Sequence, residues 1–210
     1  MSGISAQGST LQIATGTGST KTITAITVGN PAIVTSAAHG FSNGDVVTLA
    51  AIVGTMSSLN STVHVVANTT TNTFALLDVD TTGLTYTSGG TATSSTYTKI
   101  NGLLNFNGFD GAAAELDTTD LDSTAAEYIS GFVDEGKFGF EIKVLKTDPG
   151  QVSLRAARVS GAVTGLKLTL PDASVASFDV LVKTIPSAGG VNAVLKGTVD
   201  CKISGSVSWA

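Results

Sequence analysis

The sequence predicts a mainly β fold with one or two short helices. Charged residues make up only 13% of the 210 residues, whereas Gly, Ser, Thr, Ala and Val dominate, and this composition favours short strands and turns over long helices. The apolar fraction of 42% is too high for a disordered chain. No apolar run approaches the ~20 residues of a membrane-spanning helix, so we expect a soluble protein with no membrane partner.

Composition changes near residues 21 and 96, which predicts three parts: an arm over 1–22, a compact β-module over 23–95 and a larger domain over 96–210. Between Ile23 and Thr93 the only charged residues are three aspartates. Alternating apolar positions there predict strands separated by Gly- and Asn-rich turns, at 22–28, 32–35, 45–50, 63–67, 73–77 and 85–87. In the arm, Gly16-Thr17-Gly18-Ser19 reads as a flexible joint.

The domain after residue 96 begins with a predicted strand over 100–109, which Gly102 and Gly108 interrupt. An acidic stretch then predicts a first helix over 123–130, with Asp122 as its N-cap and Gly131 as its C-terminal stop. Three apolar side chains would pack this helix onto the sheet, namely Leu121, Ile129 and Phe132.

The rest of the chain continues with a strand over 138–144, because apolar residues alternate there with Gly139, Glu141 and Lys143. A second helix should start at Asp148, with Pro149 in its first turn, and end near residue 160. Strands over 166–170 and 176–183 predict a hairpin. The alternation over 191–209 would make a strand of about 60 Å, so it must bend or split at Gly197 or Gly205.

Residues that carry chemistry in other proteins are few, and their arrangement predicts no catalytic site and no cofactor. His39 precedes a glycine in a turn, His64 alternates with valines, and Cys201 alternates with Val199 and Ile203 as a core strand residue would. Two histidines and one cysteine give no zinc set with usable spacing. A Gly-x-Ser-x-Gly nucleophile motif and a Gly-Lys phosphate loop are both missing.

Two aspartate pairs have the alternate spacing of calcium loops: Asp78 with Asp80, and Asp120 with Asp122. Neither pair is followed by the glycine and the distal glutamate that complete such a loop. We therefore predict no metal site.

The acidic stretch is the main feature of the charge pattern. Between Asp110 and Glu135 there are eight carboxylates and no Lys or Arg, and a block of this sign repels phosphate. Its simplest interpretation is a solvated face. Glu115 and Asp117 could form the acid pair of a glycosidase, but they stand two apart on an extended segment, which favours solvated acids.

The acidic stretch and its flanks resemble phage tail tube proteins. The resemblance rests on the stretch from Thr118 to Gly136, on Ile100-Asn101-Gly102-Leu103-Leu104-Asn105-Phe106 before it, and on Lys137-Phe138-Gly139-Phe140-Glu141-Ile142-Lys143-Val144 after it. It covers residues 96–210 and the small-residue start from Met1 to Ala14. The resemblance depends on the order of the elements and not on any one residue.

The resemblance implies a non-enzymatic virion protein with a β-sandwich or partly closed barrel flanked by a helix. Neighbouring subunits would join their sheets around a hexameric ring, and stacked rings would form the tube of a long tail. The implied partners are further copies of the chain, a tape measure protein and a tail terminator, while DNA passes without specific binding. The implied location is the virion tail, assembled in the host cytoplasm.

A conduit for DNA should present negative charge, because each phosphate that it bound would slow the passing DNA. Glu115 and Asp117 are the candidates to line such a channel. The loop that contains Ser187, Gly189, Gly190 and Asn192 is a candidate assembly segment that becomes ordered on contact.

The predicted module resembles a small β-barrel module of phage virion proteins. The resemblance rests on three segments, Ile26 to Val34, Ala38 to Val47 and Tyr86 to Gly90. This implies an insertion after the first arm of the tube fold. The alternative function is a virion fibre or decoration protein that binds a host-surface sugar or receptor. Such a protein would need exposed aromatic side chains, and only 6% of the chain is aromatic.

Overall fold

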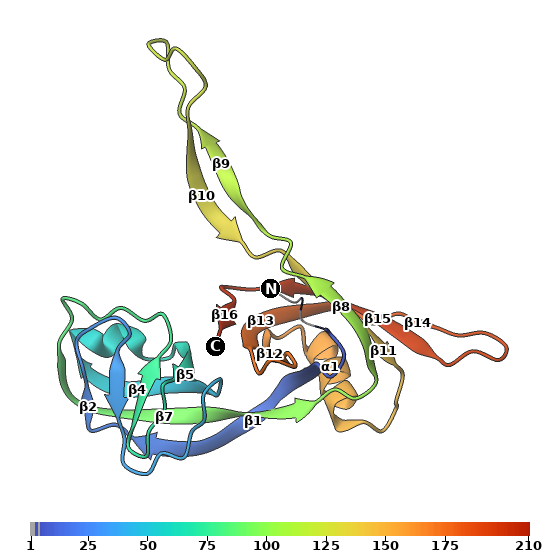
Figure 1. Ribbon diagram of the computed structural model, residues 1–210, viewed down its shortest axis with the longest axis horizontal. Helices are drawn as coiled ribbons and strands as arrows, with labels where there is room; N and C mark the ends of the chain where they lie inside the picture. Colours follow the sequence, from blue (N-terminus) through green and yellow to red (C-terminus); the bar gives the residue numbers. More distant parts are fainter. Residues whose placement is uncertain (1–2, 4) are drawn as a thin grey trace. The chain divides into compact units, whose positions relative to one another are not determined.

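The computed structural model describes residue 3 and residues 5–210, and it is built mainly of antiparallel strands (Figure 1). Met1, Ser2 and Ile4 of the predicted arm lie outside the described residues. In the described part, one α-helix, α1 (Pro149–Ser160), and one 3-10 helix, η1 (Thr55–Leu59), accompany the strands. The mainly β prediction with one or two short helices is confirmed.

The chain forms two compact units. Unit 1 comprises Met1–Lys99, Leu166–Ser177 and Ser208–Ala210, and unit 2 comprises Ile100–Gly165 and Phe178–Val207. Two of the four boundaries between the units fall inside strands β12 (Thr164–Thr169) and β13 (Val175–Thr184), and the other two follow Lys99 and Val207.

Unit 1 holds a sheet with the strand order β2-β3-β6-β5-β4-β7-β1-β12. Its other strands are β1 (Thr10–Thr22), β2 (Ala25–Ile26), β3 (Ile33–Thr35), β4 (Val46–Gly54), β5 (Val63–Ala67), β6 (Thr73–Leu76), β7 (Tyr86–Lys99) and the short β16 (Ser208–Trp209) beside β13. Five strands of the predicted module thus form close to where alternation places them. β5 agrees with its prediction at both ends.

Among the residues that the structure describes, unit 1 has a hydrophobic cluster formed by side chains between positions 23 and 92. Its fully buried members come from β3, β4, β5, β6, β7 and η1 and include Val34, Leu49, Met56, Val66, Phe74, Leu76 and Ala92. Burial of a large apolar side chain contributes about 1.5–3 kcal/mol. The segment between β1 and β7 therefore supplies its own core.

β1 and β7 pair along what we call the β1–β7 ribbon, from Gln12 opposite Lys99 to Thr22 opposite Thr91. The predicted flexible joint at Gly16–Ser19 is wrong, because these residues belong to β1. The short strand predicted at 85–87 is likewise only the start of β7. Both ribbon strands are rich in Thr and Ser, mostly exposed on β1 and mostly half-buried on β7, which suit a strand but give no apolar alternation to recognise.

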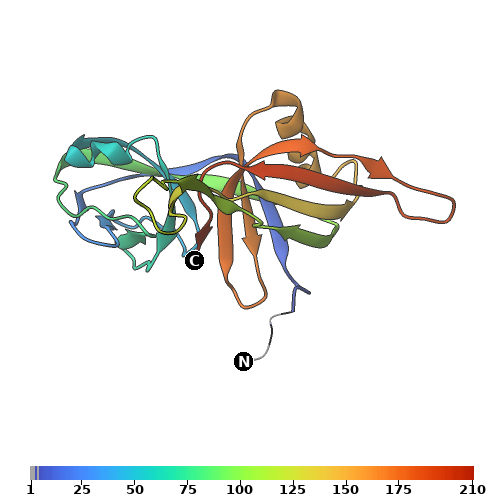
Figure 2. The ribbon, with the colours of Figure 1, turned by 90° about the horizontal axis from the view of Figure 1, so that it is seen from above.

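Unit 2 holds the strand order β13-β15-β11-β8, with β14 paired to β15, and a separate two-stranded sheet of β9 and β10. The bounds are β8 (Leu103–Gly108), β9 (Ala112–Asp117), β10 (Tyr128–Asp134), β11 (Lys137–Lys143), β14 (Ser187–Ala188) and β15 (Lys196–Ile203). Helix α1 lies beside the strands of this unit (Figure 2).

The core of unit 2 is centred on β11, whose apolar residues alternate as predicted. Phe138, Phe140 and Ile142 are buried, while the residues between them are half-buried. The ring of Phe138 lies 4.9 Å from that of Phe178 and 5.4 Å from that of Phe109, measured between centroids. This aromatic cluster joins β11 to β13 and to the end of β8.

The first predicted helix is wrong. Residues 123–130 form no helix, and the chain makes a β-hairpin of β9 and β10 instead. Leu121, Ile129 and Phe132, expected to be buried, are 105%, 55% and 95% exposed. Asp122 caps no helix, because the carboxylate of Asp120 accepts the backbone N–H of Asp122 in a local turn. Such local bonds compete with helix formation, and the β-branched and aromatic residues of β10 favour a strand.

The second predicted helix is confirmed. Asp148 is the N-cap of α1, its Oδ2 accepts the N–H of Gln151 at 2.9 Å, and Pro149 stands in the first turn. Gly161 ends the helix with φ 65°, a left-handed conformation that glycine adopts without strain.

The C-terminal third follows the predicted pattern in part. β12 and β13 make the expected hairpin, closed by a bond from the N–H of Leu170 to the carbonyl oxygen of Ser174. The alternating segment over 191–209 splits before Gly205, which has φ 87°. Gly205 is one of the two positions at which we expected a break. The other expectation is wrong, because Gly197 is buried inside β15. No helix among the described residues is long and apolar enough to cross a membrane.

Candidate assembly surfaces

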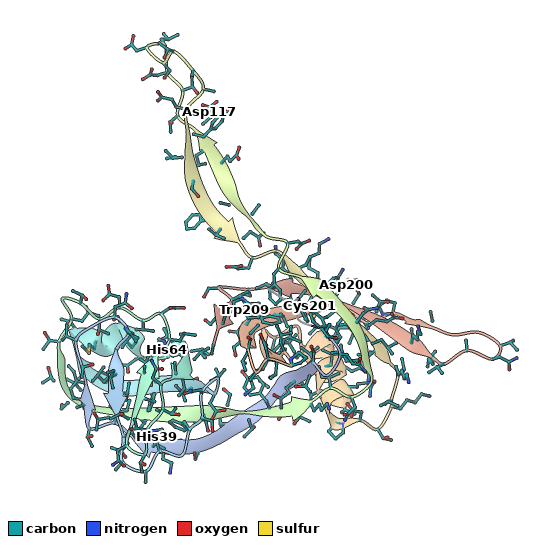
Figure 3. All side chains as sticks on the ribbon, viewed as in Figure 1. His39, His64, Asp117, Asp200, Cys201 and Trp209 are labelled. Atoms are coloured by element: carbon teal, nitrogen blue, oxygen red, sulfur yellow. The ribbon has the colours of Figure 1, made fainter. Side chains whose placement is uncertain are left out.

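The strands β9 and β10 and their connection form what we call the acidic hairpin, residues 110–136. It extends beyond the main sheet of its own unit, and Asp117 lies near its outer end (Figures 1 and 3). Every residue of β9 and all but one of β10 are exposed. Since no side chain of the hairpin contributes to the buried core, its sequence is free to serve contacts with other molecules.

The acidic hairpin has two chemically different faces. Leu116 is paired with Ile129, and their side chains share one face, because directly opposed residues of antiparallel strands point the same way. The neighbouring pairs put Glu115, Asp117 and Tyr128 on the other face. We call these the apolar face and the acidic face.

The tip of the hairpin is held by local hydrogen bonds. The carboxylate of Asp120 accepts from the N–H of Asp122 at 3.0 Å and from the hydroxyl of Ser123 at 3.1 Å. The Oγ1 of Thr119 accepts the N–H of Glu127 at 2.9 Å. Between these anchors the Leu121 side chain is fully exposed, with a carboxylate on either side in the sequence.

The base of the hairpin is joined to the main sheet of unit 2 by two ion pairs. Lys202 on β15 lies 2.6 Å from the Oδ1 of Asp134, and Lys137 on β11 lies 3.9 Å from Asp110. A Cβ on Gly111 would collide with the carbonyl oxygen of Asp134. A larger residue at that position would separate the two strands at their base.

Hydrogen bonds lower the pKa of two hairpin carboxylates, Asp117 and Asp134. The side chain and N–H of Thr119 lower the pKa of Asp117. The hydrogen bond from Lys202 is the main cause of the lowered pKa of Asp134, and the N–H of Gly136 adds to it. These hydrogen bonds favour the ionised form of both carboxylates.

A pocket of about 450 Å³ lies elsewhere in unit 2, between α1, the end of β11 and the β14–β15 hairpin. Four apolar side chains and three cationic ones line it, together with Gln151 and Ser187. The apolar residues are Ile142, Val144, Ile185 and Leu195, and the cations are Lys146, Arg155 and Arg158. We call it the cationic pocket.

One buried glutamine positions the wall of this pocket. The Nε2 of Gln151 donates to the carbonyl oxygens of Lys143 and Asn101 at 2.7 and 2.8 Å, and its Oε1 accepts the N–H of Leu145. These bonds attach the first turn of α1 to the end of β11, and so fix the helix that carries Arg155 and Arg158.

The cations of the pocket have no acidic partner among the described residues. Arg155 donates from Nη2 to the carbonyl oxygen of Lys146 at 2.8 Å. Within the part of the chain that the structure describes, Lys146, Arg155 and Arg158 form no ion pair. The pocket therefore offers unneutralised positive charge beside an apolar floor.

The predicted assembly segment after β14 is an exposed loop. Ser187 pairs with Gly197 and also lines the cationic pocket. Gly189 and Gly190 lead into a turn in which the N–H of Ala193 donates to the carbonyl oxygen of Gly190. Asn192 in this turn has φ 60°. The role of this loop in assembly stays a prediction.

Both histidines make contacts that fit a role in the fold. His39 is buried, and its ring lies 5.2 Å from that of Phe41 and 5.1 Å from that of Phe74. Its Nδ1 accepts the N–H of Phe41, which leaves Nε2 to donate to the carbonyl oxygen of Thr73. Burial lowers the pKa of His64, against a smaller opposite effect of the Leu59 backbone.

The remaining polar candidates also have local roles. Cys201 is buried in β15, and burial, helped by the charge of Asp200, raises its pKa to about 12. The carboxylate of Asp80 accepts the N–H of Thr82 in a turn. Among the described residues, no three His, Cys, Asp or Glu side chains gather in a group that could hold a metal.

Sequence reasoning missed the cationic pocket. Arg155 and Arg158 are three apart and so share a face of α1, which is a signal that the sequence does contain. Lys146 and Leu195 join them only through the tertiary fold. Glu115 and Asp117 do lie on one face, as residues two apart on a strand must.

Comparison with known proteins gives two family matches. Residues 79–210 match the family described as lambda phage tail tube protein, and residues 29–95 match the FCCH domain of the ubiquitin-activating enzyme E1. No curated protein matches the sequence. A chain in the cryo-EM structure of the anti-feeding prophage baseplate, 6-fold symmetrised, is similar over 55% of this chain and 84% of its own length, with 12% identity and a TM-score of 0.43. A likeness at that level is too weak to support an inference.

Proposed function

Because this chain belongs to the lambda phage tail tube protein family, we propose that it assembles into stacked hexameric rings that form the tube of a long phage tail. The role is structural and involves no enzymatic step. DNA travels through the tube during ejection, and a tape measure protein and a tail terminator are its expected tail partners.

The observation that carries this proposal is the acidic hairpin, which no single copy of the chain buries. Leu116, Ile129 and Phe132 are 52%, 55% and 95% exposed on it, and large exposed apolar groups of this kind mark surfaces that meet another molecule. Strand β8 adds a second open surface, because it ends the sheet of unit 2. Unpaired backbone groups on an edge strand can extend the sheet of a neighbour.

The two faces of the hairpin fit a channel wall. In the assembled tube the apolar face packs on a neighbouring subunit, and the acidic face lines the channel with Glu115 and Asp117. Phosphate groups are repelled from such a wall, so passing DNA finds no binding sites on it. This arrangement gives the block of eight carboxylates a function beyond solvation.

We also propose that residues 23–95 form an inserted module on the outside of the tube. Two observations support the insertion. One hydrophobic cluster of unit 1 is formed, among the described residues, by side chains between 23 and 92, and the FCCH domain match covers 29–95. A module with its own core can be carried on the surface without a part in the tube wall.

Electron microscopy of the purified, concentrated protein tests the proposed function. Rings or tubes with six-fold projections are expected. Monomers at high concentration that bind host cells would contradict the tube and support the fibre or decoration alternative. A variant with Phe132→Ser and Ile129→Ser should remain folded, because both side chains are exposed in the free chain, and should lose the tubes.

A further inference from the structure

The tip of the acidic hairpin and the cationic pocket have complementary chemistry. The tip presents the fully exposed Leu121 between Asp120 and Asp122. The pocket presents an apolar floor bordered by Arg155 and Arg158, together with a lysine at position 146. An apolar side chain flanked by two carboxylates matches an apolar floor flanked by cations.

The size of the pocket agrees with this match. Its volume of about 450 Å³ falls in the range of about 300–1,000 Å³ of sites that enclose small ligands. That is room for one branched side chain with part of its neighbours. The four apolar side chains of the floor give the Leu121 methyl groups a place out of water. The guanidinium of Arg158, or the N–H groups of Arg155 that do not donate to Lys146, can donate to a carboxylate.

The charges of the two surfaces are also both unsatisfied in the single chain. The three cations of the pocket form no ion pair among the described residues. Asp122 uses only its backbone N–H in the turn that Asp120 holds. Its carboxylate is therefore free for a partner, while that of Asp120 already supports the tip.

We propose that the tip of the acidic hairpin of one copy docks into the cationic pocket of another copy, with Leu121 on the apolar floor and Asp122 against Arg155 or Arg158. The proposal rests on the proposed tube function, since it names the contact through which copies associate. The two surfaces are different, so the contact is heterologous and can repeat from copy to copy.

Cross-linking between two single-cysteine additions tests the contact directly. One variant carries Leu121→Cys and the other Leu195→Cys, and the two are mixed with a short bis-maleimide. Covalent heterodimers are expected. The native Cys201 does not interfere, because it is buried with a pKa raised to about 12 and the reagent needs an accessible thiolate.

A matched control replaces Leu195→Cys by Val28→Cys. Val28 is 57% exposed but does not line the cationic pocket, so it should give at most one-tenth of the heterodimer yield. Equal yields with Val28→Cys and Leu195→Cys would overturn the proposal. The proposal would also be overturned if the native protein forms tubes but the two cysteine variants give no heterodimers. That result would leave the tube function intact.

Charge exchange supplies a second test. Asp122→Lys and Arg158→Glu should each raise the protein concentration needed for tube formation about tenfold, the factor that corresponds to ~1.4 kcal/mol per contact. The chain with both changes restores an opposite-charge pair and should return to within about threefold of the native value. A double variant no better than the worse single variant would contradict the pairing.

Other occupants of the pocket give different outcomes. If a short DNA duplex blocks the cross-link and Arg158→Glu removes its binding, the pocket is a phosphate site and the proposal is wrong. If the native protein forms no rings or tubes at all, the proposed function fails, and the cross-link at high protein concentration still decides whether tip and pocket meet.

Discussion

Two phenylalanines show how the same residue type serves opposite purposes in this chain. Phe138 is fully buried among four aromatic rings, whereas Phe132 is 95% exposed on the acidic hairpin. Phe138→Ala should lower the free energy of unfolding by about 3–5 kcal/mol, because it leaves a cavity in the core. Phe132→Ala should change it by less than about 0.5 kcal/mol, as urea denaturation of both variants can measure.

The assembly of the same two variants provides the control. Phe132→Ala should be the one that weakens tube formation while its unfolding midpoint stays native. A large loss of stability in Phe132→Ala would show that the hairpin packs against its own chain.

A second prediction concerns Asp148, which caps α1 and is buried. Its carboxylate accepts the side-chain N–H of Asn101 at 2.6 Å and the N–H of Gln151 at 2.9 Å. Asp148→Ala should cost about 1–3 kcal/mol. Asp122→Ala should cost less than about 0.5 kcal/mol, since Asp122 caps no helix. Chemical denaturation at neutral pH ranks the two.

The contribution of Asp148 should also depend on pH. Burial alone would raise the pKa of this carboxyl, but the hydrogen bonds from Asn101 and Gln151 outweigh burial and lower it. A carboxyl with a lowered pKa stabilises the fold fully above its unfolded pKa of ~3.9 and loses this effect as the pH falls through the folded value. The stability difference between native protein and Asp148→Ala should therefore be constant above about pH 5 and shrink below about pH 4. A difference that grows in acid would contradict this sign.

The lone thiol gives a third prediction at this scale. With its pKa raised to about 12 by burial and by Asp200, Cys201 should not react with a thiol reagent in the folded protein and should react at once in denaturant. Leu121→Cys should add one fast-reacting thiol in the folded, unassembled protein, where this position is fully exposed. Rapid labelling of the unchanged protein would mean that β15 opens readily.

At the scale of elements, apolar alternation predicted β5, β11 and the β12–β13 hairpin, and cap chemistry predicted α1. Alternation works there because one face of each strand is buried. It failed for the acidic hairpin, where Ile129 and Phe132 are three apart and so fit the buried face of a helix equally well. Sequence patterns report which residues are apolar but not what covers them. The cationic pocket was out of reach for another reason, because its residues meet only through the tertiary fold.

The module prediction can be tested at this scale with a deletion designed on the strand register. Thr17 on β1 lies directly opposite Ser95 on β7, so a two-residue Asn-Gly turn can join them and close the ribbon. Replacing residues 18–94 in this way should give a folded chain that still forms tubes. As a control, deleting only residues 46–59 removes β4 and η1 from the module core and should yield misfolded protein. Insoluble product from the first deletion would show that the tube domain needs the module.

At the scale of the whole molecule, the charge distribution predicts how tubes treat DNA. Assembled tubes should bind duplex DNA negligibly even at ~0.01 M salt, where charges act over about 30 Å. Glu115→Lys with Asp117→Lys should leave tubes of normal length but slow DNA ejection, because each new cation can hold a phosphate. Ejection kinetics of phage carrying the variant provide the measurement.

The matched control for that experiment adds two lysines to the module, as Ser57→Lys with Ser58→Lys, both at exposed positions. This variant should eject DNA at the native rate. Normal ejection by the hairpin variant would remove Glu115 and Asp117 from the channel, and failure to form tubes would assign them to a subunit contact.

The register of the β1–β7 ribbon has a consequence for how such chains diversify. The chain leaves at Thr17 and returns at its cross-strand partner Ser95, so the intervening residues are attached at two adjacent points. A recombination event at this position can add, remove or replace a whole domain without shifting any residue of the remaining fold, provided that the incoming domain has neighbouring ends. The residues inserted at this point can therefore change by whole-domain exchange, while the remaining fold varies independently of them.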